Sequence, residues 1–463
     1  MSLRLRLPTG GRNGSRSERG QRFPVWDDPR PWIRIRKFRS RKEKTLMRYN
    51  PFRPNSIIAP GMFHGRIPEL DSIEQSLFQT KNQNPSHFLI QGERGIGKSS
   101  LFLMVKWIAS GIIETTEKVR FNFLVLSVDL GDANTQLDII RAIGREFRST
   151  LQEREHIKAR AKAFWEFCTN WEILGVRYHK DAGSFDPQDA ADELVNQISD
   201  LCNQLSDTID GILILIDEAD RPAEEAGLGA LTKLITERLT RKRCDKVLFG
   251  LAGLPSLISK LRASHESSPR IFNTMLLEPL LPDERRLVIE SGVRQANEKN
   301  QKATTVSDEA YNLLSGLSEG YPHFIQQFAY SAFETDSDYR IDAHDVIEGA
   351  FAENGALSQL GNKYFSEMYH SKIASDQYRT VLNTMAGHSD KWVSRKDLIN
   401  ESKLPSTTVN NALSALKTRE IIIADESRKG RGFYRLPTKS FATWINAIKS
   451  VEEETGKPIG AND

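Results

Sequence analysis

The eight residues from Gly92 to Ser99 constrain the fold of this chain more than any other stretch. They fit the pattern G-x-x-x-x-G-K-[ST], with a predicted strand at 87–91 before them and a predicted helix at 99–110 after them. Glycines let such a loop curl until its backbone N–H groups point at phosphate oxygens, and the helix adds its positive N-terminal end. We predict that phosphates bind at Gly92, Glu93, Arg94, Gly95, Ile96, Gly97, Lys98, Ser99 and Ser100.

A pair of acids follows the most apolar predicted strand. Asp217 and Glu218 come directly after residues 211–216, and the carboxyl ends of parallel strands meet at one edge of a sheet. We expect Ser99 and Asp217 to hold Mg²⁺, with Asp217 acting through water, while Lys98 reaches the β and γ phosphates of a nucleotide. Glu218 would orient or deprotonate the attacking water, which favours a hydrolase over a nucleotide-storing switch.

Short apolar segments alternate with helical ones between residues 87 and 252. Strands are predicted at 87–91, 121–130, 212–216 and 247–252, and helices at 99–110, 135–151 and 228–240. Such alternation is typical of a parallel sheet covered on both faces, so we predict an α/β fold. About 80 residues separate the second strand from the third, more than one crossover helix needs. We expect inserted helices at about 152–206, with a loop around 181–187.

The remainder of the chain is predicted to form first a helical domain and then a domain that combines helices with a hairpin. Residues 282–370 are expected to form a helical second domain. Helices at 377–385, 394–402 and 405–418, followed by a hairpin within 421–435, resemble a winged helix-turn-helix. Its candidate contacts with double-stranded DNA are Asn410, Asn411, Lys417, Arg428, Lys429, Arg431 and Arg435. The alternative is that this domain docks a protein partner.

Charge is distributed unevenly along the chain. Residues 1–48 hold 15 Lys and Arg against 4 Asp and Glu, a net charge of +11. Residues 371–450 hold 14 against 7, or +7, whereas residues 49–370 hold 34 against 46, or −12. Basic ends on an acidic body are typical of a chain that touches nucleic acid, although a solvated basic surface gives the same pattern.

The first 46 residues are rich in Arg, Gly, Ser and Pro and show no apolar periodicity, so we expect disorder. Three interpretations stay open: a basic arm that binds nucleic acid, a transit peptide, or a start at Met47 that makes the preceding residues an artefact. Trp26-Asp27-Asp28 argues against a transit peptide. We favour the start at Met47, because coherent sequence begins at Tyr49.

Composition excludes several other classes of protein. With 463 residues, 39% hydrophobic and 27% charged, the chain is long enough for about three domains. Its three cysteines, Cys168, Cys202 and Cys244, show no zinc-ligand spacing, and a reducing cytoplasm is the simplest compartment. No apolar run approaches the ~18 residues of a membrane span, so no membrane partner is expected.

Five blocks together resemble the AAA+ ATPases of the initiator-like branch, which includes origin-recognition and STAND-related proteins. Beside the phosphate loop and the Asp217-Glu218 pair, these are Phe63–Leu70, Leu251–Pro255 and Gly320–His323. The resemblance covers about 50–345. It implies ATP as the nucleotide, with Gly65 and Arg66 beside the adenine, His323 beside the phosphates, and a helical lid over the site.

The sequence departs from this family's pattern at two positions. The first sensor position, usually polar, falls within Ala252-Gly253-Leu254, with Ser256 the nearest hydroxyl. His323 stands where the lid usually carries an arginine, and an imidazole would make the effect depend on pH. Both departures suggest slow or partner-stimulated hydrolysis. The resemblance also implies an arginine finger at Arg270, or alternatively Arg262, that completes a neighbour's site through self-association.

The sequence thus predicts a parallel P-loop NTPase sheet with a helical lid and a C-terminal winged helix. The expected function is Mg²⁺-dependent ATP hydrolysis coupled to DNA binding. The alternative is a nucleotide-gated interaction protein whose winged helix and helical insertion dock a protein partner. The expected parts are a basic tail at 1–46, an ATPase domain at 47–281, a lid at 282–370, a winged helix at 371–450 and an acidic tail at 451–463.

Overall fold

The computed structural model describes residues 48–57, 60–115, 118–153, 164–165, 187–352, 354–373, 375–389, 391–419, 421–425 and 432–455. Its largest sheet is parallel throughout, with the strand order β2-β3-β4-β1-β5. The strands are β1 (Phe88–Gln91), β2 (Phe123–Val128), β3 (Gly211–Ile216), β4 (Val247–Gly253) and β5 (Asn273–Leu276). The α/β prediction is confirmed.

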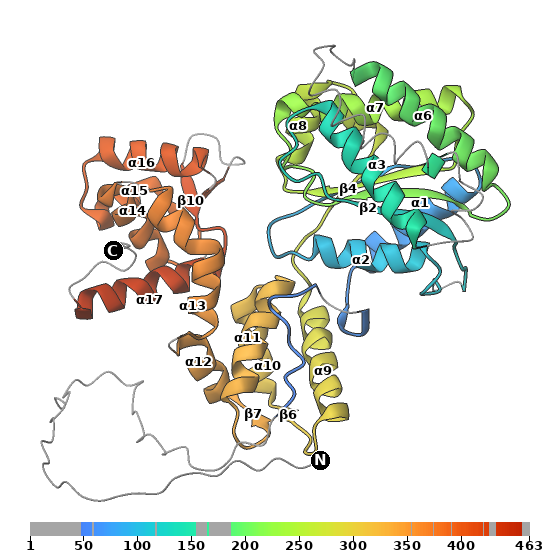
Figure 1. Ribbon diagram of the computed structural model, residues 1–463. Helices are drawn as coiled ribbons and strands as arrows, with labels where there is room; N and C mark the ends of the chain where they lie inside the picture. Colours follow the sequence, from blue (N-terminus) through green and yellow to red (C-terminus); the bar gives the residue numbers. More distant parts are fainter. Residues whose placement is uncertain are drawn as a thin grey trace, which may run out of the picture. The chain divides into compact units, whose positions relative to one another are not determined.

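Continuous apolar sequence forms the strands because this sheet is covered on both faces. Every residue of β1, β3 and β4 is buried. Helices α3, α6, α7 and α8 cover one face, and α1 and α2 cover the other (Figure 1). Their bounds are α1 (Ile67–Lys81), α2 (Lys98–Ala109), α3 (Gln136–Gln152), α6 (Pro187–Gln204), α7 (Leu228–Arg241) and α8 (Leu257–Ser264), with short turns η1 (Pro60–Met62), η2 (Glu224–Ala226) and η3 (Ser268–Ile271).

Strand β4 brings the two predicted phosphate-site segments to the same sheet edge. It lies between β1, which leads into the glycine loop, and β3, which leads into the acid pair. The Gly92 N–H donates to the Gly253 carbonyl at 3.2 Å, and the Ala219 N–H donates to the Ala252 carbonyl at 2.8 Å. Both segments are therefore fixed to the end of one buried strand.

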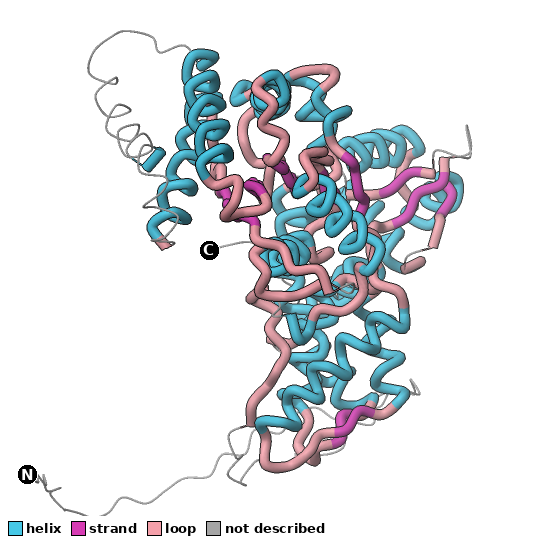
Figure 2. Tube along the Cα trace, turned by 90° about the vertical axis from the view of Figure 1, so that its right-hand side faces the viewer, coloured by secondary structure: helices cyan, strands magenta, loops and turns pink. Residues whose placement is uncertain are grey.

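A helical lid follows the sheet and includes one short parallel strand pair (Figure 2). Its elements are α9 (Pro282–Lys299), β6 (Thr305–Val306), α10 (Asp308–Ser318), α11 (Pro322–Thr335), β7 (Arg340–Ile341) and α12 (Ala343–Phe351). The segment after Tyr49 runs along this lid: the Tyr49 N–H donates to the Asn300 side chain at 2.8 Å, and Phe52 is buried in the lid core. Residues from opposite ends of the ATPase region thus share one core.

The C-terminal segment contains the predicted helices and hairpin strands. Ser394 caps α15 by accepting a hydrogen bond from the Asp397 N–H, as its position before the helix predicts. The short antiparallel sheet has the order β8-β10-β9. The elements are α13 (Ala356–Leu360), two π-helical turns η4 (Gly361–Phe365) and η5 (Glu367–Ser371), α14 (Asp376–Gly387), β8 (Val393–Ser394), α15 (Arg395–Ser402), α16 (Ser406–Thr418), β9 (Ile423–Ala424), β10 (Phe433–Arg435) and α17 (Lys439–Thr455).

One boundary of the structure differs from the expected one. Helix α17 continues to Thr455, five residues past the end expected for the winged helix, and buried Phe441 and Ile445 anchor it. Of the predicted insertion, residues 187–204 form α6, while 154–163 and 166–186 lie outside the described residues. The tail expected at 1–46 also lies outside them. Among the helices that the structure describes, none has the length and apolar character needed to cross a bilayer.

Candidate nucleotide site

The glycine loop adopts backbone conformations that its glycines make accessible. Gly95 and Gly97 have φ of 79° and 101°, in the left-handed region that side chains disfavour. Gly97 stands directly before the first residue of α2, so the loop leads into a helix N-terminus. The Arg66 guanidinium, nearly fully buried, donates to the Ile96 carbonyl at 3.1 Å and pairs with Glu69. Arg66 therefore braces the loop from outside.

Ser99 and Asp217 are brought into direct contact. The Ser99 hydroxyl donates to Asp217 Oδ2 at 2.6 Å, joining residues 118 positions apart. A serine hydroxyl and one carboxylate, completed by substrate phosphates and water, form the ligand set that Mg²⁺ takes in phosphoryl-transfer sites. The two side chains therefore fit this ion.

Lys98 folds back onto the loop. Its ammonium donates to the Gly92 carbonyl at 2.8 Å and to the Glu93 carbonyl at 3.0 Å. Burial lowers the pKa of Lys98, while the negative charges of Asp217 and Asp220 act in the opposite direction. A phosphate anion at this position would replace neutral carbonyl partners by a charged one.

Glu218 stands beside the site in a strained conformation. Its φ is 48°, and its carboxylate accepts a hydrogen bond from Arg221 at 2.8 Å. Arg221 also pairs with Asp132 at 3.1 Å. The adjoining Asp220 accepts from the Leu254 N–H at 2.9 Å, so a carboxylate fixes the backbone of the segment where the resemblance placed the polar sensor.

A cavity of about 850 Å³ opens over these groups. Its sheet-side wall consists of residues from the runs 94–100 and 217–221 together with Leu254. Its lid-side wall consists of the run 53–57 with Pro322, His323, Gln326, Lys363 and Tyr364. Pockets of this size hold small organic ligands.

Sequence motifs do not reveal most of the lid-side wall. Arg53, Gln326, Lys363 and Tyr364 belong to no recognised motif, and more than 300 positions separate the first from the last. Only the tertiary structure joins them: the Arg53 N–H donates to Gln326 Oε1 at 2.8 Å, and Lys363 contacts the Asn55 side chain. A lysine in a helical stretch, such as Lys363, resembles any surface lysine in sequence.

His323 lies on the cavity wall, where the sequence placed it. Its backbone N–H donates to the Gly95 carbonyl at 3.2 Å, and its ring lies 5.1 Å from that of Tyr364, centroid to centroid. Burial, aided by the positive charge of Lys363, lowers the pKa of His323 to about 4. With this pKa the imidazole is uncharged near neutral pH.

A second, smaller recess adjoins the cavity. It is lined by Phe63, His64, Arg66, Ile96 and other residues of the lid and loop, and its volume of about 20 Å³ suits roughly one water molecule. Gly65 lies nearby, where a Cβ would come within 2.7 Å of Glu284. This recess is where the resemblance places the adenine, and a base would have to widen it.

Other predicted residues lie elsewhere. Arg262 and Arg270 are exposed and do not line the cavity. On α16, Asn410, Asn411 and Lys417 are exposed, and Arg435 lies over Trp392 at 5.2 Å from the ring centroid. Residues 428, 429 and 431 lie outside the described residues. The structure therefore tests neither a trans contact nor a DNA contact.

A comparison with protein families indicates a P-loop NTPase domain. Residues 66–238 match the model of the KAP family P-loop domain, a span that includes the glycine loop and both acids. Similar solved structures are the Aeropyrum pernix ORC2 protein in ADPNP–ADP complexes (14% identity, TM-score 0.48, 88% of this chain and 98% of that chain) and the Aeropyrum pernix ORC1 protein in complex with DNA (17%, 0.40, 86% and 94%). A third is Drosophila ORC bound to DNA (11%, 0.41, 84% and 88%). No curated protein matches the sequence.

Proposed function

We propose that this chain, which contains a P-loop NTPase domain, binds ATP with Mg²⁺ and hydrolyses it to ADP and phosphate. The observation that carries the proposal is the 2.6 Å hydrogen bond between Ser99 and Asp217. It joins the residue after the phosphate-binding lysine to the acid after β3, the two groups that would hold the ion. Bound Mg²⁺ would neutralise charge on the phosphates.

Glu218 is the candidate general base. To reach a water in the cavity, its carboxylate must exchange the hydrogen bond to Arg221 for one to the water. Both partners are largely exposed, and pairs of this kind contribute only about 0–1 kcal/mol, so the exchange is accessible. Asp217 accepts from the Glu218 N–H at 2.9 Å and so fixes the spacing between ion ligand and base.

A steady-state phosphate-release assay with and without Mg²⁺ tests the activity. We expect ATP-dependent release that disappears when the ion is chelated. Absence of release from the wild-type chain, under conditions where calorimetry shows ATP bound, would overturn hydrolysis and leave a nucleotide-binding protein.

Self-association would complete the site through Arg270. The exposed position of Arg270, away from its own cavity, supports action on a neighbouring chain. A guanidinium is always charged and suits the charge that spreads over transferring phosphate oxygens. Mixing Arg270→Ala chains with Lys98→Ala chains should restore part of the activity, since one mixed interface keeps both groups. If no mixture exceeds either variant alone, the trans contact is wrong, and Arg262 is the next candidate.

We further propose that residues 371–450 form a winged helix that binds double-stranded DNA. Support comes from the order of α14, α15 and α16, the antiparallel β8-β10-β9 sheet, and the exposed Asn410 and Asn411 on α16. The net charge of +7 on this segment agrees with phosphate contacts.

A salt series on full-length protein tests DNA binding. Changing Arg428, Lys429 and Arg431 together to Ala should flatten the log–log salt slope by about 2–3. The matched control changes Arg241, Lys242 and Arg243, which are exposed on the ATPase domain, and should leave the slope unchanged. Changing Asn410 and Asn411 should instead relax any sequence preference.

Exposed apolar side chains support a second candidate for this domain. Trp392, which directly precedes β8, and Ile423 of β9 are 39% and 38% exposed, respectively. A protein partner would cover such a surface. A wild-type chain that binds no DNA at any salt concentration would favour this docking function.

A further inference from the structure

The lid-side wall of the cavity presents a cation with no acidic partner. Lys363 contacts the neutral amide of Asn55, and among the described residues no carboxylate forms an ion pair with it. Arg221, on the opposite wall, is already paired with Glu218 and Asp132. Lys363 is therefore a charge lining the cavity without a compensating carboxylate among the described residues.

Two buried polar atoms on the same wall have no hydrogen-bond partner among the residues that the structure describes. They are Nε2 of His323 and Nε2 of Gln326, and the Gln326 side chain is 1% exposed. Gln326 Oε1 already accepts from the Arg53 N–H, so only its amide nitrogen is unsatisfied. Buried polar atoms in native proteins nearly always have a partner, and here a ligand with several oxygens would supply one.

The turn that carries Lys363 rests directly on the glycine loop. Lys363 and Tyr364 belong to η4, a π-helical turn, a form that occurs frequently at functional sites. A Cβ on Gly95 would stand 3.4 Å from the Tyr364 hydroxyl, so the two segments are in close contact. Movement of the glycine loop around a ligand would therefore displace η4.

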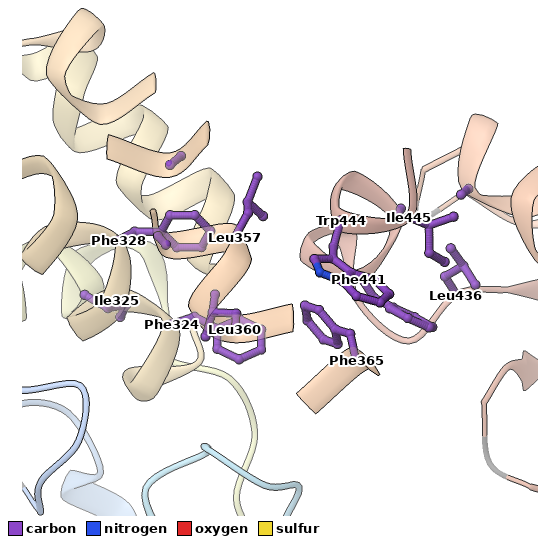
Figure 3. Close-up of a cluster of buried hydrophobic side chains, with 14 of the residues drawn as sticks. Phe324, Ile325, Phe328, Leu357, Leu360, Phe365, Leu436, Phe441, Trp444 and Ile445 are labelled. Atoms are coloured by element: carbon purple, nitrogen blue, oxygen red, sulfur yellow. The ribbon is translucent and has the colours of Figure 1, made fainter. Parts of the chain in front are cut away.

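The back of η4 is packed against α17. Phe365 is buried, with its ring centroid 6.0 Å from Phe324, 5.1 Å from Phe441 and 5.7 Å from Trp444 (Figure 3). At Gly361 the Trp444 indole approaches so closely that a Cβ would lie 1.8 Å from its nitrogen. Interiors packed this tightly transmit displacement.

We propose that Lys363 binds the terminal phosphate of ATP, and that η4 thereby reports the presence of this phosphate to α17. The inference rests on the proposed nucleotide site and assigns its phosphate-sensing residue. A lysine ammonium is a compact point charge suited to a phosphate oxygen. Because ADP lacks the terminal phosphate, Lys363 distinguishes the two nucleotides, while Lys98 contributes to binding both.

Calorimetry with MgATP and MgADP tests the assignment. Lys363→Met should weaken ATP binding about 10-fold or more, since a charge-assisted contact is lost, and change ADP affinity less than about 2-fold. Lys372→Met is the matched control, because Lys372 is exposed, follows η5 directly and does not line the cavity. It should behave as wild type, and retained ADP binding shows that the Lys363 variant is folded.

Hydrogen exchange of α17 gives a second readout that needs no turnover. In the wild type, ATP should protect the backbone amides of 439–449 more than ADP does. In Lys363→Met, ATP and ADP should protect these amides to the same extent. If wild type binds both nucleotides but the variant keeps the full preference for ATP, or α17 responds alike to both nucleotides, the inference is wrong while the site stands. If wild type binds neither nucleotide, the proposed function itself is wrong.

Discussion

The two walls of the cavity are built by opposite means. The sheet-side wall comes from two short runs, 94–100 and 217–221, together with Leu254. The lid-side wall gathers Arg53, His323, Gln326 and Lys363 from segments that only the folded lid and the C-terminal turn bring together. A short continuous run fixes the geometry of its side chains through its own backbone, so its function is visible as a sequence motif. A wall assembled from segments far apart in the chain produces no such motif.

The walls also differ in how their polar groups are satisfied. On the sheet side, Lys98 donates to two carbonyls, Ser99 to Asp217, and Arg221 to Glu218. On the lid side, the Nε2 atoms of His323 and Gln326 have no hydrogen-bond partner within the described part of the chain. The sheet side is thus preorganised, whereas the lid side has hydrogen-bonding capacity left for a ligand.

The largest expected effect concerns the sheet-side wall. Glu218→Gln keeps the shape of the side chain but removes the base, and should slow ATP hydrolysis by about 10²–10⁴-fold with little change in ATP affinity. Phosphate release and calorimetry measure the two quantities separately. Glu225→Gln, at a nearby exposed position outside the cavity, is the control. Wild-type turnover in Glu218→Gln would remove Glu218 from the chemistry.

The next largest effect concerns the packing between η4 and α17, which lies behind the lid-side wall and outside the cavity. Gly361→Ala places a methyl group against the Trp444 indole and should destabilise the packing of α17 by about 3 kcal/mol, the upper end of usual overpacking costs. Hydrogen exchange of 439–449 measures this loss. Gly316→Ala, where a Cβ meets open space, is the control. Unchanged protection in Gly361→Ala would show that α17 does not depend on this contact.

Acid should weaken the sheet region through His87. Burial lowers the pKa of His87 to about 4, below the ordinary 6.5, and its Nδ1 accepts from the Phe249 N–H. As pH falls through 6.5, the unfolded state therefore binds more protons than the folded state. The stability that the folded state has above pH 6.5 is lost progressively on acidification. Between pH 7 and 5 this loss is about 2 kcal/mol. Hydrogen exchange of β1 and β4 should show it in wild type.

Two variants isolate the contribution of this imidazole. His87→Gln keeps an acceptor without a titrating ring, so its sheet region should lose about 2 kcal/mol less than wild type over the same range. His344→Gln, at a highly exposed position, should match wild type. Equal acid sensitivity in wild type and His87→Gln would contradict the assignment.

The smallest effect has the opposite sign and lies in the lid. Burial, with the nearby charges of Asp342, Asp336 and Asp338, raises the pKa of Asp345 to about 6. Its contribution to stability is therefore present below pH 3.8 and lost as pH rises through 6. Asp345→Asn should stabilise α12 at pH 7 by about 1 kcal/mol, a figure reduced because the side chain is partly exposed. Hydrogen exchange of α12 that is unchanged or faster would contradict this.

Sequence reasoning located most of the core elements because their patterns are local. The apolar run at 211–216 predicted β3, and the amphipathic run at 135–151 predicted α3, whose first turn is closed by a capping box between Thr135 and Asp138. The glycine pattern identified the loop for the same reason. The contact between Ser99 and Asp217 followed from one further rule, that parallel strands end at a common edge.

The features that sequence patterns did not predict depend on tertiary packing. The pKa of His323 depends on burial under the lid and on Lys363, which no pattern near Gly320 reveals. The π-helical turn η4 depends on packing against Trp444, 83 positions after Gly361, so Lys363 could not be assigned to the cavity. Sequence patterns predicted no helix after the hairpin and an acidic tail from residue 451, whereas α17 spans Lys439–Thr455 with buried Phe441 and Ile445 near its start.

The central claim is that the cavity binds a nucleotide's phosphates through the glycine loop, and a calorimetric titration of MgATP into wild type and Lys98→Ala tests it most directly. Lys98 exchanges neutral carbonyl partners for a phosphate anion, so the variant should lose about 10-fold or more in affinity. The control is Lys242→Ala, because Lys242 is exposed, and this variant should bind ATP as the wild type does. Lys260 is unsuitable as a control, because its ammonium donates to the Pro222 carbonyl and its loss would disturb that loop. Equal ATP affinity in wild type and Lys98→Ala would contradict the account.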